Sequence, residues 1–122
     1  MGITDIALTL IRLGIFENVY PFGFRDEHPN NAAICTIAGA GKNRTLDKLS
    51  LTVAYRNTDL KTAETKMNEL GKRFRELEYA QPPDSEFYIA LVTKNSLTPD
   101  YKGQDENGRH YFELNFELTI TD

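Results

Sequence analysis

Few side chains of this chain are of the types that carry out catalysis, and those few are scattered. The two histidines, His28 and His110, lie in different segments, and Cys35 is the single cysteine. Apolar residues surround Cys35, which favours a small buried hydrophobic side chain over a reactive thiol or a metal ligand. The serines occur in no nucleophile motif: Ser50, Ser85 and Ser96. We therefore expect no enzyme active site and no cofactor.

Two carboxylates, Glu113 and Glu117, share one face of a predicted strand. Paired carboxylates are the groups that hydrolyse glycosidic bonds, and in inverting enzymes they lie ~6.5–9.5 Å apart. At the rise of a β-strand, four residue steps separate the two side chains by about 14 Å. This pair therefore predicts a charged surface rather than an acid–base site.

The stretch from Gly39 to Thr45 is rich in glycine and carries two basic residues, Lys42 and Arg44. It differs from a phosphate-binding loop, because Thr36 replaces the first glycine and Asn43 replaces the Ser or Thr that contacts magnesium. The next predicted element is a strand, whereas a phosphate loop leads into a helix N-terminus. A hairpin loop with a basic tip is the favoured interpretation.

Asp105, Asn107 and Gly108 resemble part of a calcium-binding loop. Such loops need an oxygen ligand at the first position and a bidentate glutamate at the last. Gly103 and Leu114 occupy those positions here, and neither side chain binds calcium. We therefore expect no metal site, and we expect Asn107-Gly108 to form a tight turn into the next strand.

The composition predicts one domain that spans residues 1–122. The chain has 122 residues, 40% of them hydrophobic, with no internal change of composition. Its net charge of −4 gives no general attraction to nucleic acid or to an anionic membrane. No apolar run approaches the ~20 residues of a membrane span, so we expect a soluble protein made in a cytoplasm.

The C-terminal run from His110 to Thr121 alternates between apolar and polar residues without interruption. Successive side chains of a strand leave opposite faces, so this period of two predicts a half-buried strand. One face carries Phe112, Leu114, Phe116, Leu118 and Ile120, and the other carries Tyr111, Glu113, Asn115, Glu117 and Thr119. About eleven residues span roughly 37 Å, whereas a chain of this length folds to a diameter of roughly 35 Å. The strand therefore needs neighbours along its whole length, from its own chain or from another copy.

Apolar spacing predicts the remaining elements around that strand. Helical periodicity marks Ile3–Phe16 and Asp59–Glu78, the second with Thr58 or Asp59 as its N-cap. The other extended segments are Asn18–Phe24, Ala32–Ala38, Leu49–Tyr55 and Phe87–Thr93, and Asn95–Arg109 is a predicted polar loop. Pro21 assigns the first of these segments to a sheet edge or an irregular strand. Apolar residues on both faces favour a central position for the last.

This order, α-β-β-β-α-β-β, predicts an α+β fold with two helices packed on one face of a mixed, mostly antiparallel sheet. The polar face of the C-terminal strand would then be left uncovered. On the first helix, Ile11 and Ile15 widen the apolar surface beyond one stripe. Packing into the core is the favoured explanation, because exposed apolar patches are exceptional, and contact with another subunit is the alternative.

The second helix carries a run of basic residues, Lys72, Arg73 and Arg75. Nucleic-acid binding is one explanation of that run. The acidic residues interleaved with it, Glu69 and Glu76, favour a solvated helix surface instead.

Four segments together resemble the tail-terminator and minor-capsid-type proteins of long-tailed bacteriophages and prophages. They are the aromatic run Val19-Tyr20-Pro21-Phe22-Gly23, the strand end Tyr55-Arg56-Asn57, the helix start Thr58–Ala63, and above all Gln104–Phe116. The likeness covers nearly the whole chain, and its motifs are structural rather than catalytic.

The resemblance implies a non-enzymatic virion protein located at the junction of head and tail. Such proteins look like α+β subunits that assemble, often as a hexameric ring, on the last ring of the tail tube. The ring stops polymerisation of the tube and presents a surface to the head connector. The implied partners are further copies of the chain, the tail-tube protein and a head-completion or connector protein.

No motif of the family fixes the contact residues, so these remain hypotheses. The candidates for subunit or partner contacts are Lys42 and Arg44 in the glycine-rich loop, and Asp105, Glu106 and Arg109 in the late loop. Opposite charges on the two loops would pair between neighbours, or the loops are simply solvated. Glu113 and Glu117 are candidates to face the channel, where they would repel passing DNA.

Two alternatives remain open at this point. One is another phage structural role, as a head-completion, connector or tail-tube component. The other is a small module unrelated to phage that binds a peptide or ligand on the uncovered face of the sheet.

Overall fold

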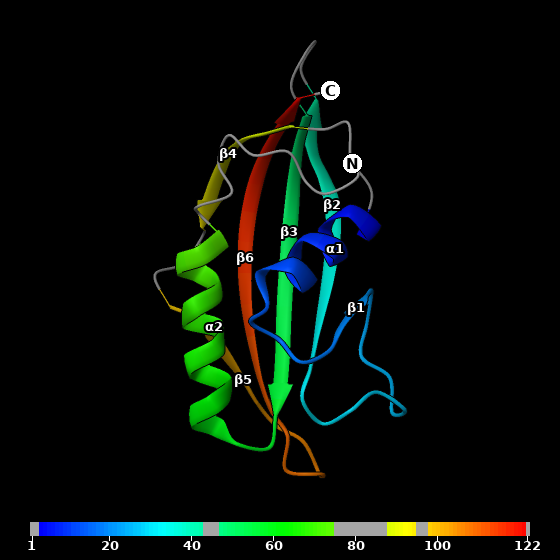
Figure 1. Ribbon diagram of the computed structural model, residues 1–122, viewed down its shortest axis with the longest axis vertical. Helices are drawn as coiled ribbons and strands as arrows, with labels where there is room; N and C mark the ends of the chain where they lie inside the picture. Colours follow the sequence, from blue (N-terminus) through cyan, green and yellow to red (C-terminus); the bar gives the residue numbers. More distant parts are fainter. Residues whose placement is uncertain (1–2, 43–46, 75–87, 95–97, 122) are drawn as a thin grey trace.

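The computed structural model describes residues 3–42, 47–74, 88–94 and 98–121, and its elements follow the predicted order (Figure 1). The helices are α1 (Ile3–Leu13) and α2 (Leu60–Phe74). The strands are β1 (Val19–Pro21), β2 (Ala32–Lys42), β3 (Asp47–Asn57), β4 (Tyr88–Lys94), β5 (Asp100–Gln104) and β6 (His110–Thr121). They form one mixed sheet of six strands, so the predicted α+β class is confirmed.

Strand β6 is the long C-terminal strand, and it has neighbours on both edges. Along one edge it pairs with β3, from His110 opposite Asn57 to Ile120 opposite Asp47. Along the other edge its C-terminal half pairs with β4 and its N-terminal half pairs with β5. The partners that this strand needs therefore come from its own chain.

Strand β5 lies inside the segment that the sequence predicts to be a polar loop. Its residues are mostly exposed, and a register shift between Tyr101 and Gly103 interrupts its pairing with β6. Gly103 has a positive φ of 103°. A short, exposed and irregular strand lacks the apolar alternation that identifies a strand in a sequence, which explains why the prediction missed it.

The prediction of a central position for the Phe87–Thr93 strand is wrong. The sheet order is β1-β2-β3-β6-β4, so β4 ends the row of strands that the structure describes. Apolar residues on both faces of a strand indicate what covers those faces, and they carry no information about its lateral neighbours. Because β3 and β4 are both antiparallel to β6, they run parallel to each other with β6 between them.

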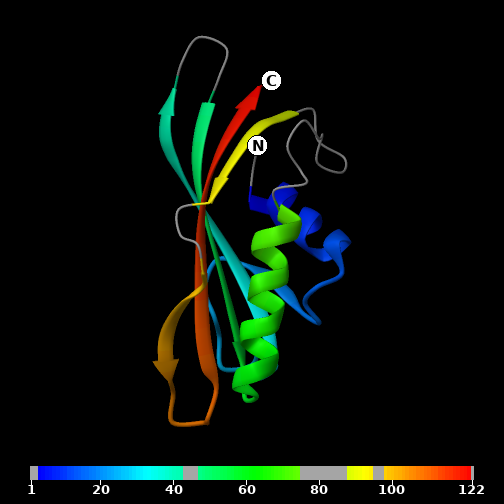
Figure 2. The same ribbon diagram turned by 90° about the vertical axis from the view of Figure 1, so that its left-hand side faces the viewer.

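Both helices lie on the same side of the sheet, as predicted (Figure 2). Helix α1 contacts β1 and β2, and helix α2 contacts β3 and β6. The inward residues of the helices, such as Leu10 and Met67, are fully buried against the apolar faces of the strands. The rings of Phe74 on α2 and Phe116 on β6 lie 4.7 Å apart.

Local signals set the helix ends. Helix α1 stops at Leu13, three residues before its predicted end, because Gly14 has a positive φ of 71° and donates its N–H to the carbonyl of Ile11. At the start of α2, Asp59 accepts a 3.1 Å hydrogen bond from the N–H of Thr62, which confirms it as the N-cap. The last predicted residues of that helix, 75–78, lie outside the described residues.

The two isoleucines that widen the apolar surface of α1 have different surroundings. Ile15 is buried, whereas Ile11 is 52% exposed. Core packing therefore accounts for the first, and the second remains a surface residue of the subunit. Neither α1 nor α2, as far as the structure describes them, is long and apolar enough to cross a membrane.

Candidate functional site

The turn between β5 and β6 is built around the carboxylate of Asp105. Its Oδ1 atom accepts hydrogen bonds from the main-chain N–H groups of Asn107 (3.0 Å) and Arg109 (2.9 Å). Its Oδ2 atom accepts from Nε of Arg109 (2.7 Å) and from the hydroxyl of Tyr111 (2.8 Å). Gly108, with φ of 77°, closes the turn. Two of the candidate interface residues, Asp105 and Arg109, are therefore paired with each other inside one turn.

The electrostatics of the turn follow from these contacts. Desolvation raises the pKa of Asp105, but hydrogen bonds from Arg109, Tyr111 and Asn107 outweigh it and hold that pKa well below its ordinary value. The hydrogen bond to Asp105 in turn raises the pKa of Arg109. Arg109 is only 7% exposed. Its ion pair with Asp105 therefore stabilises the turn, and little of the charge of either side chain is available to a partner.

Glu106 is the candidate of this loop that projects into solvent. It lines an open depression together with Asp105, Asn107, Arg109 and Asp26. Asp26 belongs to the segment between β1 and β2, so the depression lies where that segment meets the β5–β6 turn. The result is a charged end of the molecule with its acidic side chains outermost.

The glycine-rich loop lies at the opposite end of the sheet. Lys42 ends β2 and pairs with Asp47, which in turn pairs with Ile120 near the end of β6. Arg44 lies outside the described residues. Ten residue steps of β6 separate Ile120 from His110 beside the β5–β6 turn, which is about 34 Å. The two candidate loops therefore occupy opposite ends of the long axis (Figure 1).

Glu113 and Glu117 lie on the face of the sheet opposite the helices. Glu113 pairs with Ala54 and Glu117 with Ser50 across the strand boundary. Glu117 also forms a salt bridge of 3.8 Å with Lys48 on β3. We call this surface the open face. Its upper half is the half nearer the glycine-rich loop, at the top of Figure 1. Polar and small residues make up that half, among them Thr36, Ala38, Ser50, Thr52 and Asn115.

The lower half of the same face is covered, which the sequence did not indicate. Arg56 on β3 is 2% exposed, and its guanidinium donates to the carbonyl oxygens of Arg25 (3.1 Å), His28 (2.9 Å) and Pro29 (3.1 Å). Its Cζ atom lies 4.8 Å from the centre of the Phe24 ring. One buried arginine thus fixes the 22–31 segment on the sheet. Its place on the polar face of a predicted strand gave no signal of burial.

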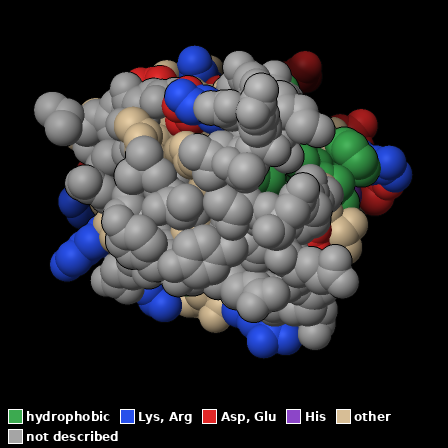
Figure 3. Space-filling view, turned by 90° about the horizontal axis from the view of Figure 1, so that it is seen from above, with side chains coloured by type: hydrophobic (Ala, Val, Ile, Leu, Met, Phe, Trp, Pro, Cys, Tyr) green, Lys and Arg blue, Asp and Glu red, His purple; other side chains and the backbone are tan. Residues whose placement is uncertain are grey.

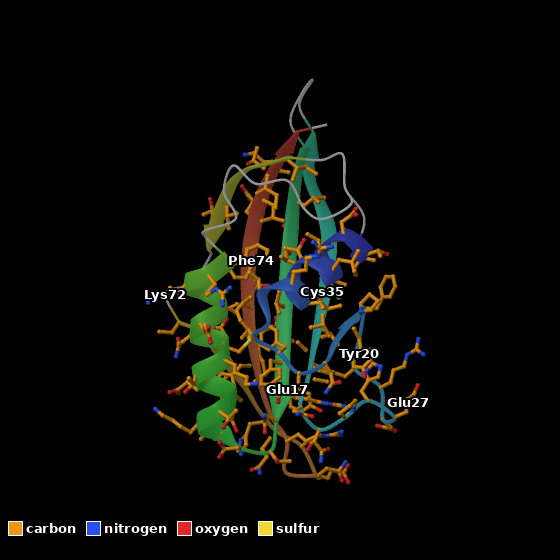
Figure 4. The ribbon with its side chains drawn as sticks, in the orientation of Figure 1. Glu17, Tyr20, Glu27, Cys35, Lys72 and Phe74 are labelled. Atoms are coloured by element: carbon orange, nitrogen blue, oxygen red, sulfur yellow. The ribbon has the colours of Figure 1, made fainter. Side chains whose placement is uncertain are left out.

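A second polar cluster, also missed from the sequence, links the helices. The carboxylate of Glu17, after α1, forms an ion pair with Lys66 on α2. It also accepts hydrogen bonds from the hydroxyl of Tyr55 (3.0 Å) and from the side-chain amide of Asn31 (2.7 Å). Figure 4 shows Glu17 in this central position, with Lys72 of α2 pointing away from the sheet.

The described residues offer little for metal or redox chemistry. They contain no group of three or more His, Cys, Asp or Glu side chains placed to hold a metal ion. Cys35 is buried, and desolvation raises its pKa to about 11, so the thiolate that would be the nucleophile is disfavoured.

Comparison with known proteins connects this architecture to a family. A family model described as bacteriophage tail terminator protein matches residues 8–122. Among solved structures, a chain of the virion of a native gene transfer agent particle superposes with a TM-score of 0.61 at 11% sequence identity, covering 95% of this chain and 86% of the other. None of the curated proteins that were compared matches the chain. The family model accounts for nearly the whole sequence, and the chain belongs to the bacteriophage tail terminator family, whose members are structural proteins of phage tails.

Proposed function

We propose that the protein assembles as a hexameric ring on the last ring of the tail tube, stops polymerisation of the tube and presents a joining surface to the head. Family membership supports the terminator role over the tail-tube and ligand-binding alternatives. The observation that carries the ring is the two-faced sheet: one face is covered by both helices, and the upper half of the other is left open by the described part of the chain.

The open face supplies a wall for the channel of such a ring. If the helices lie outside, Glu113 and Glu117 face the lumen together with small polar residues such as Ser50 and Thr52. Lys48 pairs with Glu117 and offsets part of its charge, whereas Asp100 of β5 lies opposite Glu113 and adds a further carboxylate to this face. A weakly acidic wall repels DNA and limits sticking.

The ends of the long axis supply the partner contacts. With the strands running along the ring axis, Lys42 and Arg44 fall on one rim, and Asp105, Glu106 and Arg109 fall on the other. Lateral pairing between the two loops would then be excluded, because about 34 Å separates them along the sheet. We propose instead that one rim contacts the tail tube and the other the head connector.

The protein acts as a structural subunit and not as an enzyme in this proposal. It is made in the cytoplasm of the host bacterium and becomes part of the virion at the junction of head and tail.

The test is the length of tails made without the protein. In a phage whose terminator gene is deleted, we expect tubes of uncontrolled length that do not join heads, and we expect the wild-type chain supplied in trans to restore both properties. Negative-stain images give the length distribution. Tails of normal length that still join heads would overturn the terminator role. Light scattering of the purified chain, with and without tail tubes, tests the subunit number separately.

A further inference from the structure

Among the described residues, the exposed large hydrophobic side chains fall into two pairs, and the first pair is Ile11 and Phe22. Ile11 is 52% exposed and Phe22 is 62% exposed. They belong to neighbouring elements, because α1 contacts β1 and Phe22 directly follows β1. Seen from above, hydrophobic side chains form a patch on the side where β1 and β2 lie (Figure 3). Grouped apolar residues on a surface mark interaction sites, whereas single ones need no explanation.

The second pair, Leu60 (46% exposed) and Tyr101 (50% exposed), lies around His110. The hydroxyl of Tyr101 is 2.8 Å from Nδ1 of His110. Asp59, which directly precedes Leu60, interacts electrostatically with the same histidine. The start of α2 and the middle of β5 therefore carry these two side chains to one region of the surface.

Helical geometry shows which flank of α2 carries Leu60. At about 100° per residue, the inward and buried Ala63 lies between Leu60 and Lys66 around the helix. Lys66 faces the end of α1, because it forms an ion pair with Glu17. Leu60 is therefore on the flank that points away from α1 and toward β5.

The two pairs lie on opposite margins of the lower half of the sheet. There the strands follow the order β1-β2-β3-β6-β5, so β1 and β5 are the outermost strands. Four strand spacings separate them by about 19 Å, so Phe22 and Tyr101 cannot meet within one subunit. We call the two surfaces the β1 margin (Ile11, Phe22) and the β5 margin (Leu60, Tyr101).

The two margins also match in height along the sheet. The N–H of Phe22 donates to the carbonyl of Cys35, and register carries that row across β3 to Leu114 on β6. Tyr101 pairs with Phe112, two residues along the same strand. This difference is about 7 Å, which two aromatic side chains span. A neighbouring subunit in the same orientation therefore brings its Tyr101 to the height of Phe22.

Charges of opposite sign lie below the apolar residues on the two margins. On β5 the residue after Tyr101 is the exposed Lys102. On the other side, Glu27 projects at the right-hand edge of the molecule (Figure 4) and is 71% exposed in its 3.8 Å pair with Arg25. The main chain on both sides of Glu27 accepts hydrogen bonds from Arg56, and the row of Arg56 ends at Gly103, beside Lys102. The two charges are therefore complementary and at one level.

We propose that the β1 margin of one subunit packs against the β5 margin of the next subunit. The apolar side chains of the two margins meet, and below them Glu27 of one subunit faces Lys102 of its neighbour. This proposal rests on the proposed ring. The contact joins two different surfaces, so its repetition with a constant rotation closes a ring. Every copy keeps its helices on one side of the contact and its open face on the other.

Cross-linking with a bis-maleimide tests which margins meet. In a Cys35→Ala background, Glu27→Cys with Lys102→Cys places one thiol at each margin, and we expect assembled tails to give a ladder of covalent oligomers. The two single-cysteine variants are matched controls and should remain monomeric, because a heterologous contact brings unlike surfaces together. Dimers of either single variant, without a ladder from the double variant, would overturn the proposal.

Two substitutions test the apolar part of the contact. Phe22→Asn removes the ring and suits the positive φ, which asparagine adopts more readily than most residues. Leu60→Glu introduces a carboxylate, and the monomer tolerates it because the first turn of α2 has no acidic residue and the helix dipole favours one there. We expect each variant to weaken association by about tenfold or more per contact. Thr65→Glu, exposed on the same helix, is the control and should assemble like the wild type.

A charge exchange tests the polar part. Glu27→Lys and Lys102→Glu each place like charges across the contact, and we expect each to weaken association by about two- to fivefold at low salt. The two changes together restore an opposite-charge pair and should recover assembly. Weakening by each single change without recovery in the double variant would overturn the pairing of these two residues.

The outcomes separate the two proposals. Rings that form without the cross-link and tolerate Phe22→Asn and Leu60→Glu would overturn the contact between the margins and leave the terminator ring intact. A wild-type chain that forms no ring, in isolation or on tail tubes, would overturn the ring itself. A ladder from the double cysteine variant, with loss of assembly in the apolar variants, supports both.

Discussion

The guanidinium of Arg56 on β3 donates a 2.9 Å hydrogen bond to the carbonyl oxygen of His28, in the segment that crosses the sheet. Together with the bonds to Arg25 and Pro29, this contact attaches residues 22–31 to the lower half of the open face. Replacement by alanine leaves these three carbonyl groups without their donor, and a hydrogen-bonding group left unsatisfied away from water costs about 1–3 kcal/mol. We expect Arg56→Ala to lower the free energy of unfolding by about 3–5 kcal/mol in urea titrations.

Arg56→Lys should lie between alanine and the wild type, because an ammonium group keeps the charge but not the planar arrangement of donors. The control is Arg73→Ala, which removes an exposed pair with Glu69 and should change stability by less than about 0.5 kcal/mol. Unchanged stability of Arg56→Ala, with unchanged amide exchange in residues 22–31, would contradict this role.

The carboxylate of Glu17 makes the stability of the subunit depend on pH. Desolvation raises its pKa, but hydrogen bonds from Lys66, Asn31 and Tyr55 outweigh this and lower the pKa below the ordinary value of 4.5. A lowered folded-state pKa gives stability that is present above the unfolded-state pKa and lost as pH falls through the folded-state pKa. We therefore expect Glu17→Gln to cost about 1 kcal/mol at neutral pH and to weaken the loss of stability below pH 4.5.

Urea titrations between neutral pH and about pH 3 measure this dependence. Glu27→Gln is the matched control, since Glu27 pairs with Arg25 at 3.8 Å and both side chains are 71% exposed. An acid dependence that is the same in Glu17→Gln and in the wild type would show that the Glu17 cluster does not contribute to it.

Asp105 holds the β5–β6 turn, so Asp105→Asn should loosen it. An amide presents N–H donors where Arg109 and Tyr111 also donate. We expect a lower Tm and faster amide exchange at Asn107 and Arg109, with little change at α2. The lowered pKa of Asp105 means that the wild-type turn is stable above the unfolded-state pKa and opens as pH falls through the folded-state pKa. Glu106→Gln, at the exposed tip, should leave both measurements unchanged.

Phe22 combines an exposed ring, 62% accessible to solvent, with a strained backbone whose φ is 71°, and two substitutions separate these properties. Phe22→Gly removes the ring and the strain of a positive φ, which costs about 1–2 kcal/mol for a residue with a Cβ atom. Phe22→Ala removes the ring and keeps the strain. We expect only the glycine variant to leave the monomer as stable as the wild type, or more stable by up to about 1 kcal/mol. Thermal unfolding measures the difference, and equal stability of the glycine and alanine variants would exclude backbone strain at this position.

Reversal of the charges on the open face should affect DNA passage rather than folding. Glu113 and Glu117 are only half-buried on a polar face, so Glu113→Lys with Glu117→Lys should change monomer stability by less than about 1 kcal/mol. In a ring whose lumen they face, the new positive charges attract DNA and slow its ejection. The control is Glu64→Lys on the exposed surface of α2. DNA ejection and infectivity equal to those of the wild type would argue against a lumen position for the two glutamates.

The sequence by itself determined the elements whose side chains repeat regularly. The uninterrupted alternation from His110 to Thr121 identified β6 and both of its faces, because a strand directs successive side chains to opposite sides. The sequence placed the N-cap of α2 at Thr58 or Asp59, and the hydrogen bond to Thr62 N–H selects Asp59. The order and periodicity of all the predicted segments indicated an α+β subunit with a polar sheet face that carries Glu113 and Glu117.

Only the tertiary structure decided which polar residues are free and which are used. Arg56 alternates with core residues on β3, and its burial depends on carbonyl groups almost thirty positions earlier in the chain. Asp105 and Arg109 looked like two loop charges available to a partner, yet their geometry pairs them with each other. Periodicity specifies the face from which a side chain leaves its element. The partner that it meets there depends on chain segments brought together by folding, and that information is not local.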